Sequence, residues 1–92
     1  MIKSWRHKGL KLFYETGSRA KINPNHADKL HDILQVLDFA ACPEQMNLPG
    51  LRLHRLSGYL KDFHAVSVSG NWRLIFGFDG QDAILVDYQD YH

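Results

Sequence analysis

Histidine is the residue type with the widest chemistry in this sequence, and six occur among 92 residues. Imidazole has an ordinary pKa of about 6.5, so it can act as an acid or a base near neutral pH. His54 lies between basic residues in an alternating segment, on the side opposite to the apolar residues, and His92 is the last residue. These two are the candidates for catalysis. We interpret the other four as structural: His7, His26 and His31 at the surface or at helix ends, and His64 as a partly buried residue with its hydrogen bonds satisfied.

The residues around these histidines fit metal-free cleavage of RNA. In that reaction the substrate's own 2′-hydroxyl attacks the adjacent phosphorus, so the protein supplies a base, an acid and a cation for the phosphate oxygens. Arg73 is the candidate cation, because alternation turns it away from Trp72 and its apolar neighbours. Asp90 and Tyr91 precede His92 directly after a predicted strand, and a tyrosine ring can stack on an unpaired base. The alternative for this ending is a frayed polar tail.

Basic residues are concentrated in two segments, although the net charge is only +1. Residues 1–21 contain six lysines and arginines against one glutamate, residues 51–64 contain three against one aspartate, and the other two stretches are acidic. If the basic segments meet in the fold, they form a positive patch suited to a phosphate backbone. Separate solvated faces are the alternative. The candidate RNA-contact residues are Lys3, Arg6, Lys8, Lys11, Arg52, Arg55 and Lys61.

Length and composition bound the class of protein. The chain is 45% hydrophobic and 23% charged, which is typical of a globule, and 92 residues are room for one domain, residues 1–92. No apolar run approaches the roughly 20 residues that cross a bilayer, and the first residues do not resemble a signal peptide, so we expect a cytoplasmic protein that does not bind membranes. The single cysteine, Cys42, has no partner for a disulfide or a metal site. We expect no metal and no cofactor.

The first half of the chain predicts one strand and two helices. A short apolar–polar alternation at residues 2–5 indicates the strand. A helix of roughly two to three turns should follow, with its apolar residues inward and Gly17 just past its end. The clearest helix runs from Pro24 to about Ala41, because Asn23 can cap it and apolar residues recur at helical spacing.

The second half of the chain predicts strands. Apolar residues alternate at period 2 within residues 51–57, 63–69 and 72–78, and residues 83–88 form a nearly continuous apolar run. Turn residues separate these runs. The order of strand, two helices and four strands predicts an α+β fold, in which helices cover one face of a twisted, mostly antiparallel sheet and the other face is partly open.

Four motifs follow one another over essentially the whole chain. They are Met1-Ile2-Lys3-Ser4 with His7-Lys8-Gly9-Leu10, Leu53-His54-Arg55-Leu56 with Gly58, Asn71-Trp72-Arg73 with Phe76 and Phe78, and Asp87-Tyr88-Gln89-Asp90-Tyr91-His92. Together they resemble the HigB toxins of the RelE superfamily. The Asn-Trp-Arg piece and the terminal Asp-Tyr-His piece are the most specific parts of the resemblance.

The resemblance implies a RelE-like fold and a ribosome-dependent mRNA interferase, a toxin that enters the A site of the small ribosomal subunit and cuts the mRNA there. It also implies neutralisation by a HigA antitoxin, which is a helix-turn-helix DNA-binding protein, so that operator DNA is contacted only through the antitoxin. The basic segment from Lys3 to Lys21 would then meet ribosomal RNA, and binding should weaken strongly with salt.

The resemblance also carries over to single residues. It implies that the site consists of the family's strand histidine, phosphate-binding arginine and catalytic terminus: His54, Arg73, Asp90, Tyr91 and His92. We expect His54 to be the general base and His92 the general acid. The family commonly has a lysine where this chain has Ser57, and Lys61 in the following turn is a candidate to reach the same region.

Two other classes of function remain open at this point. One is a catalytically idle relative that binds RNA or a protein partner with the same fold. The other is a metal-dependent nuclease or hydrolase with His54, Asp90 and His92 as ligands, although three such ligands without a second carboxylate cluster make a poor two-metal site. Loss of activity on chelation would favour the second class.

Overall fold

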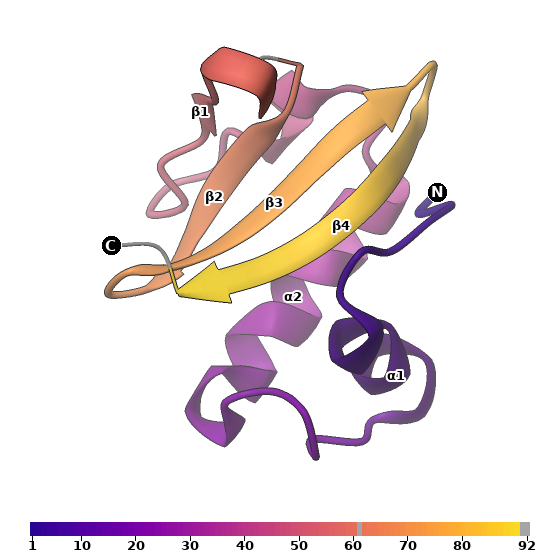
Figure 1. Ribbon diagram of the computed structural model, residues 1–92, viewed down its shortest axis with the longest axis vertical. Helices are drawn as coiled ribbons and strands as arrows, with labels where there is room; N and C mark the ends of the chain where they lie inside the picture. Colours follow the sequence, from indigo (N-terminus) through magenta and orange to yellow (C-terminus); the bar gives the residue numbers. More distant parts are fainter. Residues whose placement is uncertain (61, 91–92) are drawn as a thin grey trace.

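The computed structural model describes residues 1–60 and 62–90 and has helices on one side of a four-stranded sheet (Figure 1). In this view α2 (Ala27–Phe39) passes behind the sheet and α1 (Lys8–Thr16) lies below it. The arrangement confirms the predicted α+β class, with helices on one face and an antiparallel sheet.

The first helix, α1, has a side-chain cap at its start and a glycine at its end. The Nδ1 atom of His7 accepts a hydrogen bond of 2.9 Å from the backbone N–H of Leu10, which satisfies one of the free donors of the first turn. Leu10 and Phe13 are buried on one side of the helix. Gly17 ends it with a φ of 80°, a conformation that glycine adopts without a side-chain clash. The predicted position of His7 at a helix end is therefore confirmed.

The second helix begins with a 3₁₀ turn at Pro24–His26 that leads directly into α2. The side chain of Asn23 accepts a 3.0 Å hydrogen bond from a backbone N–H of this turn, as the sequence predicted. α2 ends at Phe39, because Ala40 is already extended. Its buried stripe consists of Ala27, Leu30, Ile33, Leu34 and Leu37.

The sheet has the strand order β1, β2, β3, β4, and every neighbouring pair is antiparallel. The bounds are His54–Arg55 for β1, His64–Ser69 for β2, Trp72–Asp79 for β3 and Asp82–Asp90 for β4. The bounds of β2, β3 and β4 agree with the predicted strands to within two positions. Tight turns at Gly70 and Gly80 join them in sequence.

The predicted strand at residues 51–57 is wrong in length. Only two residues of it form β1, and a 3₁₀ turn follows at Gly58–Leu60. The reason lies at Arg52, whose φ of 54° is left-handed and cannot continue an extended run. The carbonyl of Leu51 nevertheless accepts a 2.7 Å hydrogen bond from the N–H of Ser67, which holds this segment against β2.

The predicted strand at residues 2–5 is also wrong as a regular strand. The segment runs parallel to β4 and pairs with it at two isolated bridges, Ile2 with Ala83 and Trp5 with Val86. Backbone hydrogen bonds of 2.8–3.2 Å join the two segments. The ladder is interrupted because Leu85 has a φ of 53° and β4 shifts register against β3 nearby. β4 is therefore flanked on both sides, by β3 and by this N-terminal segment.

The core lies between the helices and the inner face of the sheet. Val66, Leu74 and Phe76 from β2 and β3 are fully buried there against Leu30 and Leu34 of α2. The inner residues of each strand alternate with residues that point to the opposite side, which we call the outer face. Helix α2 lies behind the sheet in Figure 1, so the outer face is turned toward the reader.

Candidate functional site

Two rows of paired residues cross the outer face of the sheet. Residues that pair directly across neighbouring strands point to the same side. The first row is His54, Ala65, Ile75 and Asp87, and the second is Ser67, Arg73 and Gln89. The register thus brings two of the predicted site residues, His54 and Arg73, to one face, with β2 between their strands.

His54 is exposed, and one of its ring nitrogens is already engaged. Its Nδ1 lies 2.9 Å from the carbonyl oxygen of Arg52. A carbonyl can only accept, so Nδ1 carries the hydrogen, and in the neutral ring the lone pair lies on Nε2. The left-handed conformation of Arg52 therefore fixes a tautomer with its basic nitrogen turned outward, as a general base requires.

Arg73 is half-buried and is held at the turn between β2 and β3. Its Nη1 donates hydrogen bonds to the carbonyls of Gly70 at 2.8 Å and Trp72 at 3.2 Å. Among the described residues, no hydrogen bond uses its Nε or Nη2. A guanidinium anchored on one nitrogen has the planar donor geometry that suits a phosphate.

Asp90 is the last residue of β4, and it is exposed. It pairs with Trp72, so alternation turns it to the side of Trp72 and Tyr88 rather than to the side of Arg73. The other two predicted members of the catalytic terminus, Tyr91 and His92, lie outside the described residues. The same holds for Lys61.

The sheet separates His54 from Asp90. Three strand spacings and a register offset of three residues put their backbones about 17 Å apart. Two ligands of one metal ion must both lie about 2 Å from it, so these two side chains cannot bind the same ion. Among residues 1–60 and 62–90, no group of three or more His, Cys, Asp or Glu side chains is placed to hold a metal.

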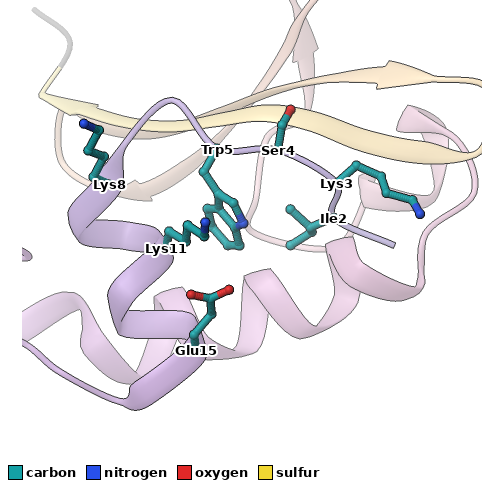
Figure 2. A pocket seen from close by; sticks show the side chains of 7 residues that line it. All are labelled: Ile2, Lys3, Ser4, Trp5, Lys8, Lys11 and Glu15. Carbon is teal, nitrogen blue, oxygen red and sulfur yellow. The ribbon is translucent and has the colours of Figure 1, made fainter.

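Three of the predicted RNA-contact residues line one pocket at the edge of β4 (Figure 2). The pocket has a volume of about 460 Å³ and lies between the N-terminal segment and α1. Lys3, Lys8 and Lys11 line it together with Trp5, and Glu15 is its acidic member. Figure 2 shows the indole of Trp5 projecting from the N-terminal segment toward α1. Figure 2 shows Lys11 beside the indole, whereas the ammonium ends of Lys3 and Lys8 point away from it.

The predicted arginines do not join that pocket. The guanidinium of Arg6 lies over the ring of Phe63, 5.8 Å from its centroid. Arg52 and Arg55 are exposed, and Arg55 pairs with His64 in the register, so alternation turns it away from the side of His54. Arg55 also lies 3.9 Å from the carboxylate of Asp62. The basic residues therefore occupy several surfaces around the sheet rather than a single patch.

The predicted surface position of His26 is wrong. His26 lies at the start of α2, as a helix-end residue should, but it is only 7% exposed, and its Nδ1 is 2.6 Å from the hydroxyl of Tyr88. Burial raises the pKa of Tyr88, so the hydroxyl keeps its proton and shares a hydrogen bond with Nδ1. Trp72 stacks on Tyr88 with ring centroids 4.6 Å apart. These contacts brace the end of β4 next to Asp90.

His64 is partly buried as predicted, but its hydrogen bonding was predicted wrongly. Its ring stacks on Phe76 with centroids 6.3 Å apart. Its Nδ1 is buried and has no hydrogen-bond partner in the described part of the chain. Burial lowers the pKa of His64, Glu44 raises it, and the positive charge of Arg55 lowers it further.

Sequence reasoning missed two polar residues beside Arg73. Asp87 lies on β4, is 8% exposed, and accepts a 2.9 Å hydrogen bond from the backbone N–H of Tyr88. It also accepts a 2.7 Å hydrogen bond from Nε2 of Gln89, which is exposed and pairs with Arg73. An Asp and a Gln two positions apart on a strand were the available signal, because such residues share a face.

Comparison with known proteins decides the family. The HigB-like toxin family, described as the RelE-like toxin of the type II toxin-antitoxin system HigB, matches residues 3–92. The chain belongs to the HigB toxins. It is 38% identical over 92 residues to Endoribonuclease HigB of Proteus vulgaris, with all of both chains covered. It is also 33% identical over 78 residues to a HigB toxin of Vibrio cholerae, covering 83% of this chain and 82% of that one.

Solved structures agree with the HigB fold. A copper-bound mutant toxin from Helicobacter pylori matches with a TM-score of 0.53 at 16% identity, covering 96% of this chain and 92% of that one. A conserved hypothetical protein from the same organism matches with a TM-score of 0.51 at 12% identity, covering 99% and 98%. At these identities the likeness concerns the fold alone. Within the described residues of this HigB-family chain, no helix is both long and apolar enough to span a bilayer.

Proposed function

We propose that this HigB-family toxin is a ribosome-dependent endoribonuclease that cuts mRNA in the A site of the small subunit by metal-free acid–base catalysis. The observation that carries the proposal is the position of His54 and Arg73 on the same face of the sheet. The full-length similarity to a protein named Endoribonuclease HigB supports the reaction class. The proposed products are a 2′,3′-cyclic phosphate and a 5′-hydroxyl.

In this proposal the side chains have separate roles. His54 takes the proton of the 2′-hydroxyl through Nε2, the nitrogen that its contact with the carbonyl of Arg52 leaves available. Arg73 stabilises the charge that develops on the phosphate oxygens. His92 returns a proton to the leaving 5′-oxygen, while Asp90 and Tyr91 complete the terminus. The separation of His54 from Asp90 supports a mechanism in which these two groups do not share a metal ion.

Binding to the ribosome is proposed to use the basic residues around this face. The lysines of the Trp5 pocket and the outer-face guanidinium of Arg6 present positive charge on both sides of the N-terminal segment. Ribosomal RNA is a polyanion, so association should weaken as salt concentration rises. Arg52 and Arg55 are proposed to contribute from the β1 edge of the sheet, and Lys61, which lies outside the described residues, is proposed to contribute as well.

Membership in a type II toxin-antitoxin family implies an antitoxin partner. We propose that this partner is a HigA-type helix-turn-helix protein, that it neutralises the toxin in the cytoplasm, and that operator DNA is reached only through it. Co-expression with such an antitoxin should restore growth that the toxin alone arrests. Growth arrest that persists with a soluble antitoxin present would contradict this partner.

The deciding experiment adds the purified chain to ribosomes programmed with a defined mRNA and to the same mRNA without ribosomes. We expect cleavage only on ribosomes, with a cyclic phosphate at the new 3′ end. Phenanthroline, which chelates transition metals and spares ribosomal magnesium, should leave the rate unchanged. A free 3′-hydroxyl, or loss of activity with the chelator, would overturn the metal-free mechanism. Ribosome binding without any cleavage would instead identify a catalytically idle relative.

A further inference from the structure

We propose that Gln89 reads the edge of an mRNA base beside the scissile phosphate, and that Asp87 sets which of its amide atoms faces that base. This inference rests on the proposed function, since it places RNA on the outer face of the sheet. It adds a specificity-determining pair to a site otherwise made of proton-transfer and phosphate-binding groups.

Position is the first argument. Gln89 pairs directly with Arg73 across β3 and β4, so the two side chains are neighbours on the outer face. Gln89 is exposed, whereas Asp87 is only 8% exposed. A phosphate bound at Arg73 would therefore place an adjoining nucleotide within reach of the Gln89 amide.

The orientation of the amide is the second argument. A carboxylate has no hydrogen to donate, so the atom of Gln89 that lies 2.7 Å from Asp87 must be the amide nitrogen. The carbonyl Oε1 is then turned away from Asp87, toward solvent. Asp87 is itself fixed, because its other oxygen accepts the 2.9 Å hydrogen bond from the N–H of Tyr88. The Gln89 amide is therefore held with Nε2 toward Asp87 and Oε1 toward solvent.

A fixed polarity selects between classes of base. Adenine and cytosine present an exocyclic amino donor beside a ring-nitrogen acceptor, whereas guanine and uracil present a carbonyl acceptor beside a ring N–H donor. With the phosphate held by Arg73, the base cannot turn over to reverse this order, so an amide fixed in one orientation matches one class of base and not the other. Gln89 therefore discriminates between amino bases and keto bases at one position of the codon.

The test measures relative cleavage rates on ribosomes carrying mRNAs that differ in one base of the A-site codon. The wild-type chain should cleave one class of base, either A and C or G and U, about tenfold faster than the other at one position, the size of one good base contact. Asp87→Asn keeps the shape and the bond from the N–H of Tyr88, but its amide can also donate, so Gln89 can turn over. The ratio of the cleavage rates for the two classes of base should move toward one. Gln89→Leu removes the amide and leaves residue 87 unchanged, and it should abolish the base preference in the same way.

Two further measurements make the result decisive. Gln35→Ala changes an exposed glutamine on α2, behind the sheet, and should keep the wild-type ratio. Equilibrium binding of 2′-O-methyl trinucleotides to the isolated chain gives the same ratio without cleavage, so failure of the proposed nuclease activity is distinguishable from failure of base reading. A preference between the two classes of base that Asp87→Asn and Gln89→Leu both leave intact would overturn the inference, as would a wild-type chain that shows no such preference in either assay.

Discussion

Removal of the Arg73 guanidinium should separate activity from stability. Arg73 makes hydrogen bonds to the carbonyls of Gly70 and Trp72 through a single nitrogen, and it is half-buried on the face opposite to the core. Those carbonyls are at a turn and remain accessible to water when the guanidinium is absent. Arg73→Ala should therefore lower the unfolding free energy by about 1 kcal/mol. A typical domain has an unfolding free energy of about 5–15 kcal/mol, so the variant should stay folded.

The expected effect on catalysis is larger. Arg73 is the cation proposed to face the developing phosphate charge, so its loss should remove a contact that is strongest in the transition state, typically about 3–4 kcal/mol, or roughly 10²–10³ in rate. Arg73→Lys keeps the charge but not the planar pair of donors, so its rate should lie between those of the wild type and Arg73→Ala. The comparison isolates geometry from charge.

The assay combines single-turnover cleavage on programmed ribosomes with urea unfolding of each variant. Sedimentation with ribosomes reports binding separately from cleavage. The reasoning predicts a folded Arg73→Ala variant that still sediments with ribosomes and cuts slowly. It would be refuted by an unfolded variant, or by a folded one whose cleavage rate stays within a factor of about three of the wild type, since that is only about 0.7 kcal/mol.

Three predictions concern stability. Tyr88→Phe removes the hydroxyl that shares a hydrogen bond with the buried Nδ1 of His26 and should lower the unfolding free energy by about 1–3 kcal/mol in urea titrations. Gly9→Ala would place its Cβ against Cβ of Lys21, so it should destabilise the chain by about 1–3 kcal/mol, and adding Lys21→Gly should recover most of that loss. Burial lowers the pKa of folded His64 below its unfolded value of about 6.5. The stability that neutral His64 confers is therefore fully present above about pH 6.5 and is lost as the pH falls through the folded pKa. His64→Phe should flatten that part of the profile, and an unchanged slope between about pH 5 and 7 would contradict the assignment.

Local signals were enough to predict the elements that depend on nearby residues. Asn23 caps a turn two residues away, and the stripe of α2 follows from its own periodicity. β2 and β3 alternate clearly, and a glycine turn joins them, so their register is set locally. The placement of Arg73 opposite to the core follows from the same alternation.

Features that depend on distant residues could not be read from the sequence. The shortening of β1 comes from a left-handed Arg52, and an arginine gives no local sign of that conformation. The burial of His26 depends on Tyr88, 62 positions away. The hydrogen bond between Asp87 and Gln89 joins residues that are close in sequence. Arg73 is distant in sequence and lies beside Gln89 only because β3 pairs with β4.

The parallel pairing of the N-terminal segment with β4 governs when the fold can form. Ile2 has its partner at Ala83, so the N-terminal segment lacks this pairing until residue 83 has left the ribosome. β4 also supplies the second neighbour of β3, and with it the row that places Gln89 beside Arg73. Pairings of such sequence separation form late, since loop closure precedes any gain in contacts. The nascent chain therefore has no complete outer face until β4 has been translated and has paired with β3.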